Sequence, residues 1–105
     1  MYEKIDFSHN WNNKLNCKCF TTLRLKSEKY KVGNVYEITL KGETMFFAKI
    51  IAIKTLKISQ INDFIAAIDT GYTADVMRQL IKTIYKNKVK DIDNQDFYLI
   101  LLQRI

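Results

Sequence analysis

Apolar and polar residues alternate in two stretches of the first half, residues 18–26 and 35–41, and this period of two predicts β-strands. The apolar residues of the second stretch that are expected to face inward are Tyr36, Ile38 and Leu40, opposite Glu37, Thr39 and Lys41. Residues 45–56, which follow a turn at Gly42, are apolar on both faces over most of their length. That pattern predicts a strand in the centre of a sheet, and residues 96–102 are expected to add a final strand.

The second half of the chain changes to a helical period. Apolar residues at i, i+3, i+4 and i+7 predict a helix that is capped by Ser59, buries this stripe and ends at Asp69. The stripe consists of Ile61, Phe64, Ile65 and Ile68. Gly71 suits the end of the helix because glycine tolerates a positive φ, and Thr73 is expected to cap a second helix. The buried stripe of the second helix is expected to be Met77, Leu80, Ile81 and Ile84.

A short first helix is expected over residues 8–14, because Phe7, Trp11 and Leu15 recur four residues apart. The expected order is therefore helix, three strands, two helices and a strand. Such segregation indicates an α+β fold, here a small β-barrel of about four to six strands with two main helices. The length of 105 residues suits one domain over residues 1–105.

Charge is distributed unevenly along the chain. Residues 14–57 hold ten Lys or Arg and three Glu, whereas residues 58–105 hold six residues of each sign. A segregated basic excess indicates a partner that carries phosphate. No run approaches the roughly 18 apolar residues of a membrane span, so no membrane partner is expected. The first residues show no secretory pattern, and Cys17 and Cys19 are poorly spaced for a mutual disulfide, so a cytoplasmic protein is expected.

Candidate chemistry gathers on the strand expected over residues 18–26. If this strand is regular, Lys18, Thr22 and Arg24 project from one face. An ammonium, a hydroxyl and a guanidinium on one face suit an anion-binding surface or part of a catalytic site. Thr21 reaches the same face only if a bulge intervenes, so both threonines stay candidates.

Four segments, taken in order, resemble the ASCH domain, a small β-barrel that is related to the PUA fold and associated with RNA. The segments are Phe20-Thr21-Thr22-Leu23-Arg24, Tyr30-Lys31-Val32-Gly33-Asn34, Gly71-Tyr72-Thr73 and Phe97-Tyr98-Leu99-Ile100. Some members of that family are amidohydrolases that remove the acetyl group from N4-acetylcytidine. In those members a lysine is thought to act as base, a threonine as nucleophile and a glutamate as proton donor.

The resemblance implies a role for particular residues of this chain. The Lys-x-x-Thr pair of those enzymes corresponds to Lys18 and Thr21, whereas their Thr-x-Arg spacing corresponds to Thr22 and Arg24. No glutamate occurs after Glu43, so the nearest carboxylate to the expected proton donor is Asp69, which is shorter by a methylene.

The sequence thus predicts a module that binds RNA or a modified nucleoside in a basic cleft between the first strand and the helix ending at Asp69. The expected ligand contacts are Trp11, Arg24, Lys26 and Tyr72, and the candidate catalytic residues are Lys18, Thr21, Thr22 and Asp69. One alternative is an amidohydrolase acting on N4-acetylcytidine or a related amide. Another is a protein-interaction module that uses the apolar residues 45–53. No cofactor is expected, no metal site is expected from Cys17, Cys19 and His9, and a monomer is favoured.

Overall fold

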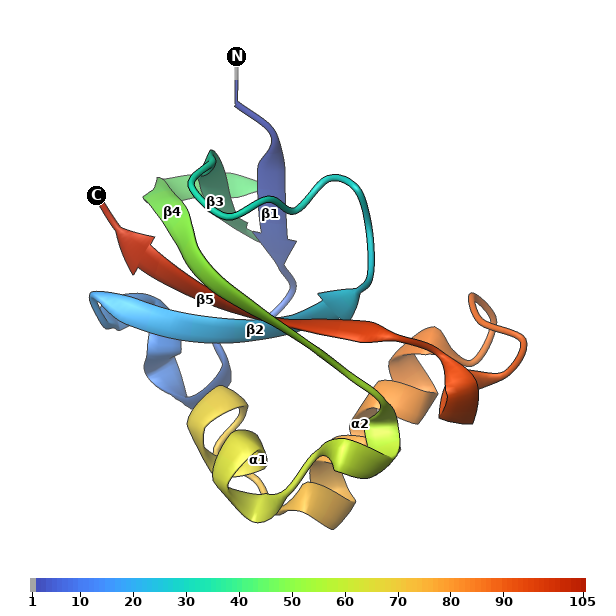
Figure 1. Cartoon of the computed structure of the whole chain (residues 1–105). Coiled ribbons are helices and arrows are strands. Elements are labelled where there is room, and N and C mark those ends of the chain that lie inside the picture. The colour runs from blue at the N-terminus through green and yellow to red at the C-terminus, as the bar shows by residue number, and fades with distance from the viewer. Residues whose placement is uncertain (1) are drawn as a thin grey trace.

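The computed structural model describes residues 2–105 and shows a five-stranded sheet that curls around an apolar interior, with two helices below it (Figure 1). In sheet order the strands are β1 (Lys4–Phe7), β3 (Val35–Leu40), β4 (Glu43–Leu56), β5 (Phe97–Arg104) and β2 (Cys19–Leu25). The helices are α1 (Asp63–Asp69) and α2 (Ala74–Tyr85), with short 3-10 turns η1 (Trp11–Asn16), η2 (Ile58–Gln60) and η3 (Ile92–Asn94). The predicted α+β class and barrel-like sheet are confirmed.

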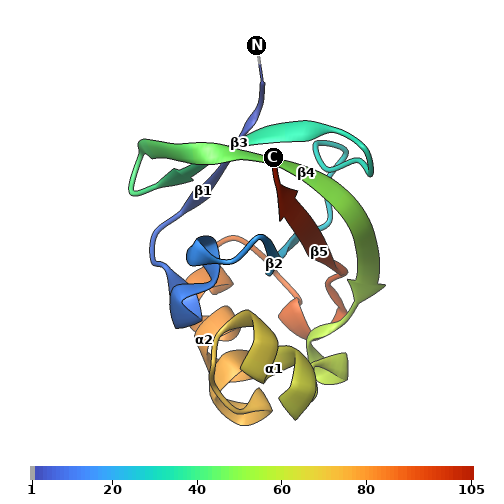
Figure 2. The ribbon, with the colours of Figure 1, turned by 90° about the vertical axis from the view of Figure 1, so that its left-hand side faces the viewer.

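The sheet stays open between its two edge strands, β1 and β2. β1 pairs in parallel with β3, and the other neighbours are antiparallel. β4 is the middle strand, as its apolar sequence predicted, and its length lets it pair with β3 at one end and with β5 at the other. Figure 2 shows this strand curving across the molecule from the upper strands toward the helices.

Two apolar clusters hold the elements together. The first fills the curled sheet and includes Phe20, Tyr36, Ile38 and Ile100. The second lies between the sheet and the helices and includes Met77, Ile81 and Phe97. Because β5 contributes to both clusters, burial of its two faces ties the sheet to the helical layer.

The first segment of the chain differs from its prediction. Residues 4–7 form a strand, because Ile5 and Phe7 alternate with polar neighbours and the segment pairs with β3, which lies far along the chain. Residues 11–16 form a 3-10 turn instead of a helix over residues 8–14. Asn12 and Asn13 both take a φ of 55°, in the left-handed region that asparagine tolerates and that an α-helix excludes.

The predicted buried stripe on the first long helix is confirmed only in part, since Ile61 is buried and Ile65 is half-buried but Phe64 and Ile68 are exposed. α1 begins at Asp63 after an Asn62 cap instead of a Ser59 cap, and its inward face carries Ala66 and Asp69. Phe64 is therefore 82% exposed and Ile68 is 63% exposed. Thr73 does cap α2, where its hydroxyl accepts a hydrogen bond from the Val76 N–H. Of the second stripe, Met77 and Ile81 are buried, while Ile84 is 47% exposed.

One residue of β3 that was predicted to face outward is buried in the structure. Thr39 was expected to face solvent but is buried, because the register shifts between Ile38 and Thr39. Its hydroxyl donates a hydrogen bond to the Asp6 carboxylate at the end of β1. Within the described chain, no helix combines the length and the apolar character that crossing a membrane requires.

Candidate functional site

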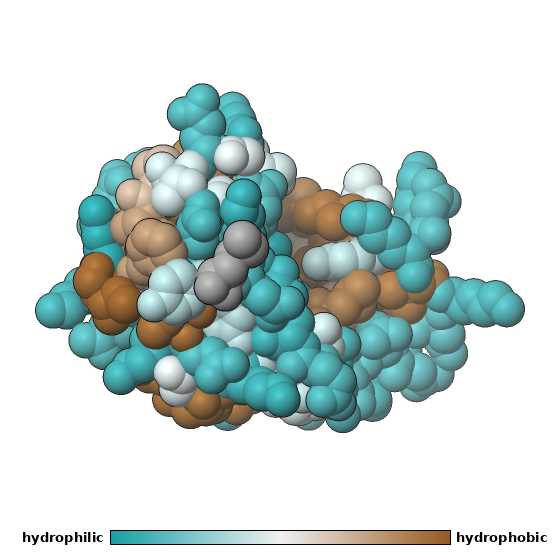
Figure 3. Space-filling model, turned by 90° about the horizontal axis from the view of Figure 1, so that it is seen from above, coloured by the Kyte–Doolittle hydropathy of each residue, from teal (hydrophilic) through white to brown (hydrophobic). Residues whose placement is uncertain are grey.

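The candidate site is a cavity of about 140 Å³ where the curled sheet stays open. The end of β1, the η1 turn, the middle of β2 and both helices form its walls. The polar side chains on these walls are Asp6, Ser8, Lys14, Thr22, Arg24, Asp69 and Thr70, and most of the rest are apolar. Seen from above, the surface is hollowed between the body of the sheet and the side of the molecule that holds α2, with apolar side chains along the hollow (Figure 3).

A buried ion pair lies on the wall of this cavity. The Lys14 Nζ is 3.0 Å from the Asp69 Oδ1, and the two side chains are only 6% and 5% exposed. Burial lowers the pKa of Lys14, the attraction of Asp69 raises it in part, and the charge of Arg24 lowers it further. The outcome is a lysine whose pKa lies below its ordinary value.

The local sequence explains how Lys14 comes to point inward. The left-handed Asn12 and Asn13 fold η1 into a tight turn that packs on α1. The Asn12 amide donates a hydrogen bond to the Ala67 carbonyl, and the Asn10 side chain accepts one from the Leu15 N–H. Gly71, at a φ of +80°, leaves room for Asn12, because a Cβ there would lie 3.1 Å from the Asn12 side chain.

Thr21 joins the ion pair from β2. Its hydroxyl donates a hydrogen bond of 2.8 Å to the Asp69 Oδ1, the same oxygen that Lys14 contacts. The structure therefore brings an amine, a carboxylate and a hydroxyl together around one oxygen. Thr21 approaches from the helix side of β2, because its neighbour Leu23 on that face packs in the cluster against the helices.

Thr22 and Arg24 lie on the other face of β2, as the alternation predicted. The Arg24 Nε donates a hydrogen bond of 2.9 Å to the Thr22 hydroxyl, and its guanidinium lies 4.7 Å from the centre of the Phe7 ring. Thr22 is buried on the cavity wall. No carboxylate within residues 2–105 lies within 4 Å of the Arg24 nitrogens.

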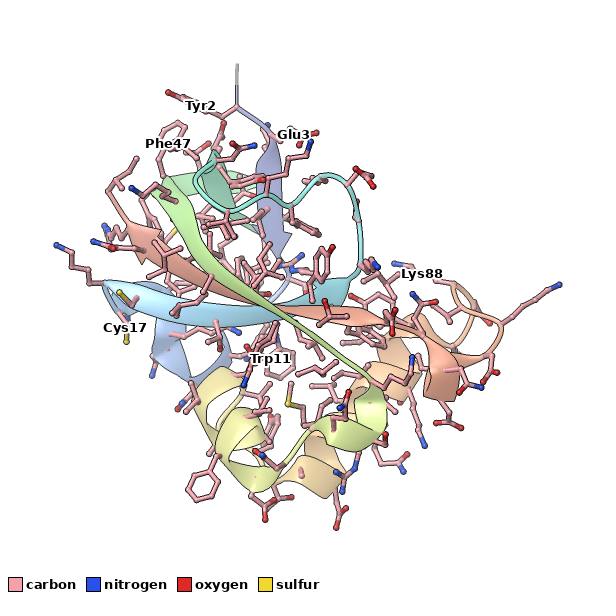
Figure 4. All side chains as sticks on the ribbon, in the orientation of Figure 1. Tyr2, Glu3, Trp11, Cys17, Phe47 and Lys88 are labelled. Atoms are coloured by element: carbon pink, nitrogen blue, oxygen red, sulfur yellow. The ribbon has the colours of Figure 1, made fainter. Side chains whose placement is uncertain are left out.

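An aromatic group borders the cavity near the end of α1. The Trp11 ring lies 6.0 Å from the Tyr72 ring and 4.5 Å from the His9 ring, measured between centres. Figure 4 shows Trp11 between the sheet and the helices, and its side chain lines the cavity. Tyr72 is 44% exposed, which leaves its ring accessible at this border.

The remaining two predicted residues lie outside the cavity. Lys18 occupies the bend before β2 and its side chain is exposed. Lys26 is exposed beyond the other end of β2, where it borders a shallow polar groove with Asn94 and Asp96. The structure thus brings Thr21, Thr22, Arg24, Asp69 and Trp11 to one place with Tyr72 beside them, and it separates Lys18 and Lys26 from them.

Lys14 is the residue that sequence reasoning missed. It was counted among the residues of an amphipathic helix, where a lysine is expected to face water. The signal that could have identified it is the run of asparagines at positions 10, 12 and 13, which favours a turn over a helix. In the described part of the chain, no three His, Cys, Asp or Glu side chains are close enough to hold a metal ion.

Comparisons with known proteins bear on the fold. No protein-family model and no curated protein matches the sequence. Among solved structures, the chain is similar to an ASCH domain from Lactobacillus crispatus JV V101, with a TM-score of 0.69 and 11% sequence identity. The match covers 97% of this chain and 78% of that one. This chain therefore has the fold of an ASCH domain, a small barrel-like sheet of the PUA type with its helices on one side.

Proposed function

We propose that this protein binds RNA or a nucleoside by placing one base in the cavity between β2 and the helices. The observation that carries the proposal is the buried Lys14–Asp69 pair on the cavity wall. A buried ion pair is often no more stabilising than apolar residues of the same size. Charged donors and acceptors inside an otherwise apolar cavity are instead suited to orienting a polar ligand.

The size of the cavity supports the binding of a ligand with a single ring. Its volume of about 140 Å³ is close to the roughly 150 Å³ of an engineered apolar cavity that accepts benzene. A pyrimidine base has a ring of that size and carries donors and acceptors on its edge. Trp11 and Phe7 offer aromatic walls, and bases stack on such side chains in single-stranded RNA recognition.

The test is calorimetric titration of the protein with cytidine and with uridine. The double variant Lys14→Met with Asp69→Leu removes both charges, so neither partner is left buried and unpaired. We expect it to bind at least tenfold more weakly than the wild type. The comparison variant is Lys18→Met, which removes an exposed lysine and is expected to bind within twofold of the wild type. Equal affinity in the wild type and the double variant would refute the proposed site.

A second candidate function is hydrolysis of an amide such as N4-acetylcytidine. The observation that favours it is the meeting of Lys14, Thr21 and Asp69 around one oxygen. A hydroxyl nucleophile needs a nearby base, and the lowered pKa of Lys14 makes a neutral amine more accessible. In this arrangement Lys14 takes the role that the family resemblance had implied for Lys18.

The hydrolysis hypothesis is tested by incubating the protein with N4-acetylcytidine and separating the products by chromatography. We expect cytidine to accumulate with the wild type and with Lys18→Met, but not with Thr21→Val. Thr21→Val keeps the shape of the side chain and removes only the hydroxyl that donates to Asp69. Absence of cytidine at high protein concentration would exclude this second function and leave the binding proposal intact.

A further inference from the structure

A second polar group includes Arg24 and Tyr85, which line the same cavity as the Lys14–Asp69 pair. Tyr85 from the end of α2 lines the cavity together with Arg24, and Tyr30, in the loop after β2, is half-buried beside Tyr36. Burial raises the pKa of each tyrosine, and the positive charge of Arg24 opposes that rise at both. One guanidinium therefore acts on two phenols that come from separate elements.

Most donors of this group have no hydrogen-bond partner within residues 2–105. Only the Nε of Arg24 is engaged, by Thr22, so the two terminal nitrogens remain available. The hydroxyls of Tyr30 and Tyr85 make no hydrogen bond to any residue in the range 2–105, whereas Tyr36, whose ring lies beside that of Tyr30, makes two. Since no buried polar atom of the described chain is left without a partner, these hydroxyls are open to a ligand or to water.

Two lysines add positive charge from opposite sides. The Lys29 Nζ lies 5.6 Å from the centre of the Tyr30 ring, and the Lys88 Nζ lies 5.9 Å from that of Tyr85. In Figure 4 the Lys88 side chain extends from the segment after α2 toward the sheet. The loop after β2 and the segment after α2 thus each place one lysine beside one of the two tyrosines.

No acidic group of the described chain forms an ion pair with Arg24. Asp6 lies on the cavity wall, but its Oδ1 already accepts hydrogen bonds from the Thr39 hydroxyl and from the Gly42 N–H. These bonds, with a smaller effect of Arg24, hold the pKa of Asp6 below its ordinary value. Glu3 acts weakly on Tyr30 and forms no ion pair in the described chain. A half-buried guanidinium with free terminal donors suits a phosphate, which accepts two parallel hydrogen bonds from arginine.

We infer that Arg24, Tyr30 and Tyr85, with Lys29 and Lys88 at the margin, form a phosphate subsite next to the base cavity. The inference rests on the proposed function and narrows its ligand to a nucleotide, free or within RNA, in preference to a bare nucleoside. Arg24 supplies the bidentate contact, the two hydroxyls donate to further oxygens, and the lysines attract the anion from solution.

The test compares binding of cytidine, cytidine 3′-monophosphate, cytidine 5′-monophosphate and inorganic phosphate at low and moderate salt. We expect one of the monophosphates to bind at least tenfold more tightly than cytidine, and the gain to shrink as salt rises. Arg24→Gln should abolish the gain in affinity of the monophosphate over cytidine. Lys88→Gln, an exposed substitution that leaves the fold unchanged, should reduce it severalfold, whereas Lys86→Gln, two residues away and exposed, should not change it.

The outcomes separate this subsite from the base cavity. Equal affinity for cytidine and both monophosphates would overturn the phosphate subsite and leave the base cavity supported. Binding of inorganic phosphate that is lost in Arg24→Gln, without any cytidine binding, would support the subsite and refute the base cavity. No binding of any of the four compounds would refute both.

Discussion

Replacing Lys14 by methionine is expected to be among the most damaging single polar changes in this protein. The substitution keeps an unbranched side chain that is one atom shorter, and it leaves the Asp69 carboxylate, whose side chain is 5% exposed, with only the Thr21 hydroxyl as a side-chain partner. Breaking a buried pair by removing one charge costs about 3–5 kcal/mol. Domains of this size are stable by only about 5–15 kcal/mol, so the loss is a large share of the total.

The assay is urea unfolding followed by fluorescence of Trp11, the single tryptophan of the chain, which lies on the wall of the same cavity. We expect the midpoint of unfolding to fall sharply for Lys14→Met. Lys18→Met is the matched control, since an exposed lysine is expected to contribute less than about 0.5 kcal/mol. Adding Asp69→Leu to Lys14→Met should restore most of the loss, because no buried charge then remains unpaired.

Two results would contradict the reasoning. If Lys14→Met lowered the unfolding free energy as little as Lys18→Met does, the Lys14–Asp69 pair would not be a buried interaction in solution. If the double variant were less stable than Lys14→Met alone, the cost would come from lost packing instead of from an unpaired charge.

Three further predictions follow from particular contacts. The pKa of Lys14 is lower in the folded state than its ordinary value of 10.5, so the unfolded chain binds more protons as pH approaches 10.5. The unfolding free energy of the wild type, measured by urea titration and compared with that of the double variant, should therefore rise with pH up to that value. Thr39→Val removes a hydrogen bond that lowers the pKa of Asp6. The stability that this bond contributes is present above the ordinary Asp pKa of 3.8 and is lost as pH falls through the lower folded value, so acid unfolding curves of variant and wild type should converge at low pH. Phe64→Ser should change the unfolding free energy by less than about 0.5 kcal/mol, and a cost of 3 kcal/mol or more would mean that α1 buries this side chain.

Strong local patterns predicted the strands well. The alternation along β2, the apolar run of β4 and the Thr73 cap of α2 depend on neighbouring residues, so the sequence displays them directly. β1 was missed because it has four residues and exists only through a parallel pairing with β3, some thirty residues away.

The orientation of α1 could not be read from its apolar spacing. The periodicity of Phe64 and Ile68 is genuine, yet the helix turns its small Ala66 and its charged Asp69 inward. Asp69 faces inward where Lys14 and Thr21 both contact it, an arrangement that joins α1 to η1 and β2, about fifty residues earlier in the chain. A pattern of hydrophobicity carries no information about such a buried polar contact.

The candidate site was predicted in part for the same reason. Thr22 and Arg24 share a face because β2 is regular, and Asp69 was found as the nearest carboxylate to the position implied by the family resemblance. Lys14 lies seven residues before Thr21 and reaches the site only through the left-handed turn at Asn12 and Asn13. Spacing along a strand pointed instead to Lys18, which the structure leaves exposed.

The most direct test of the central claim is a titration of isotope-labelled protein with cytidine, followed by amide chemical shifts in two-dimensional NMR spectra. The proposed base cavity predicts the largest shifts around Lys14, Thr22 and Thr70, and unchanged positions for Lys18 and for Lys49 on the exposed face of β4. Shifts that cluster at Lys18 or Lys49, or no shifts at millimolar cytidine, would contradict the claim that this cavity binds a base.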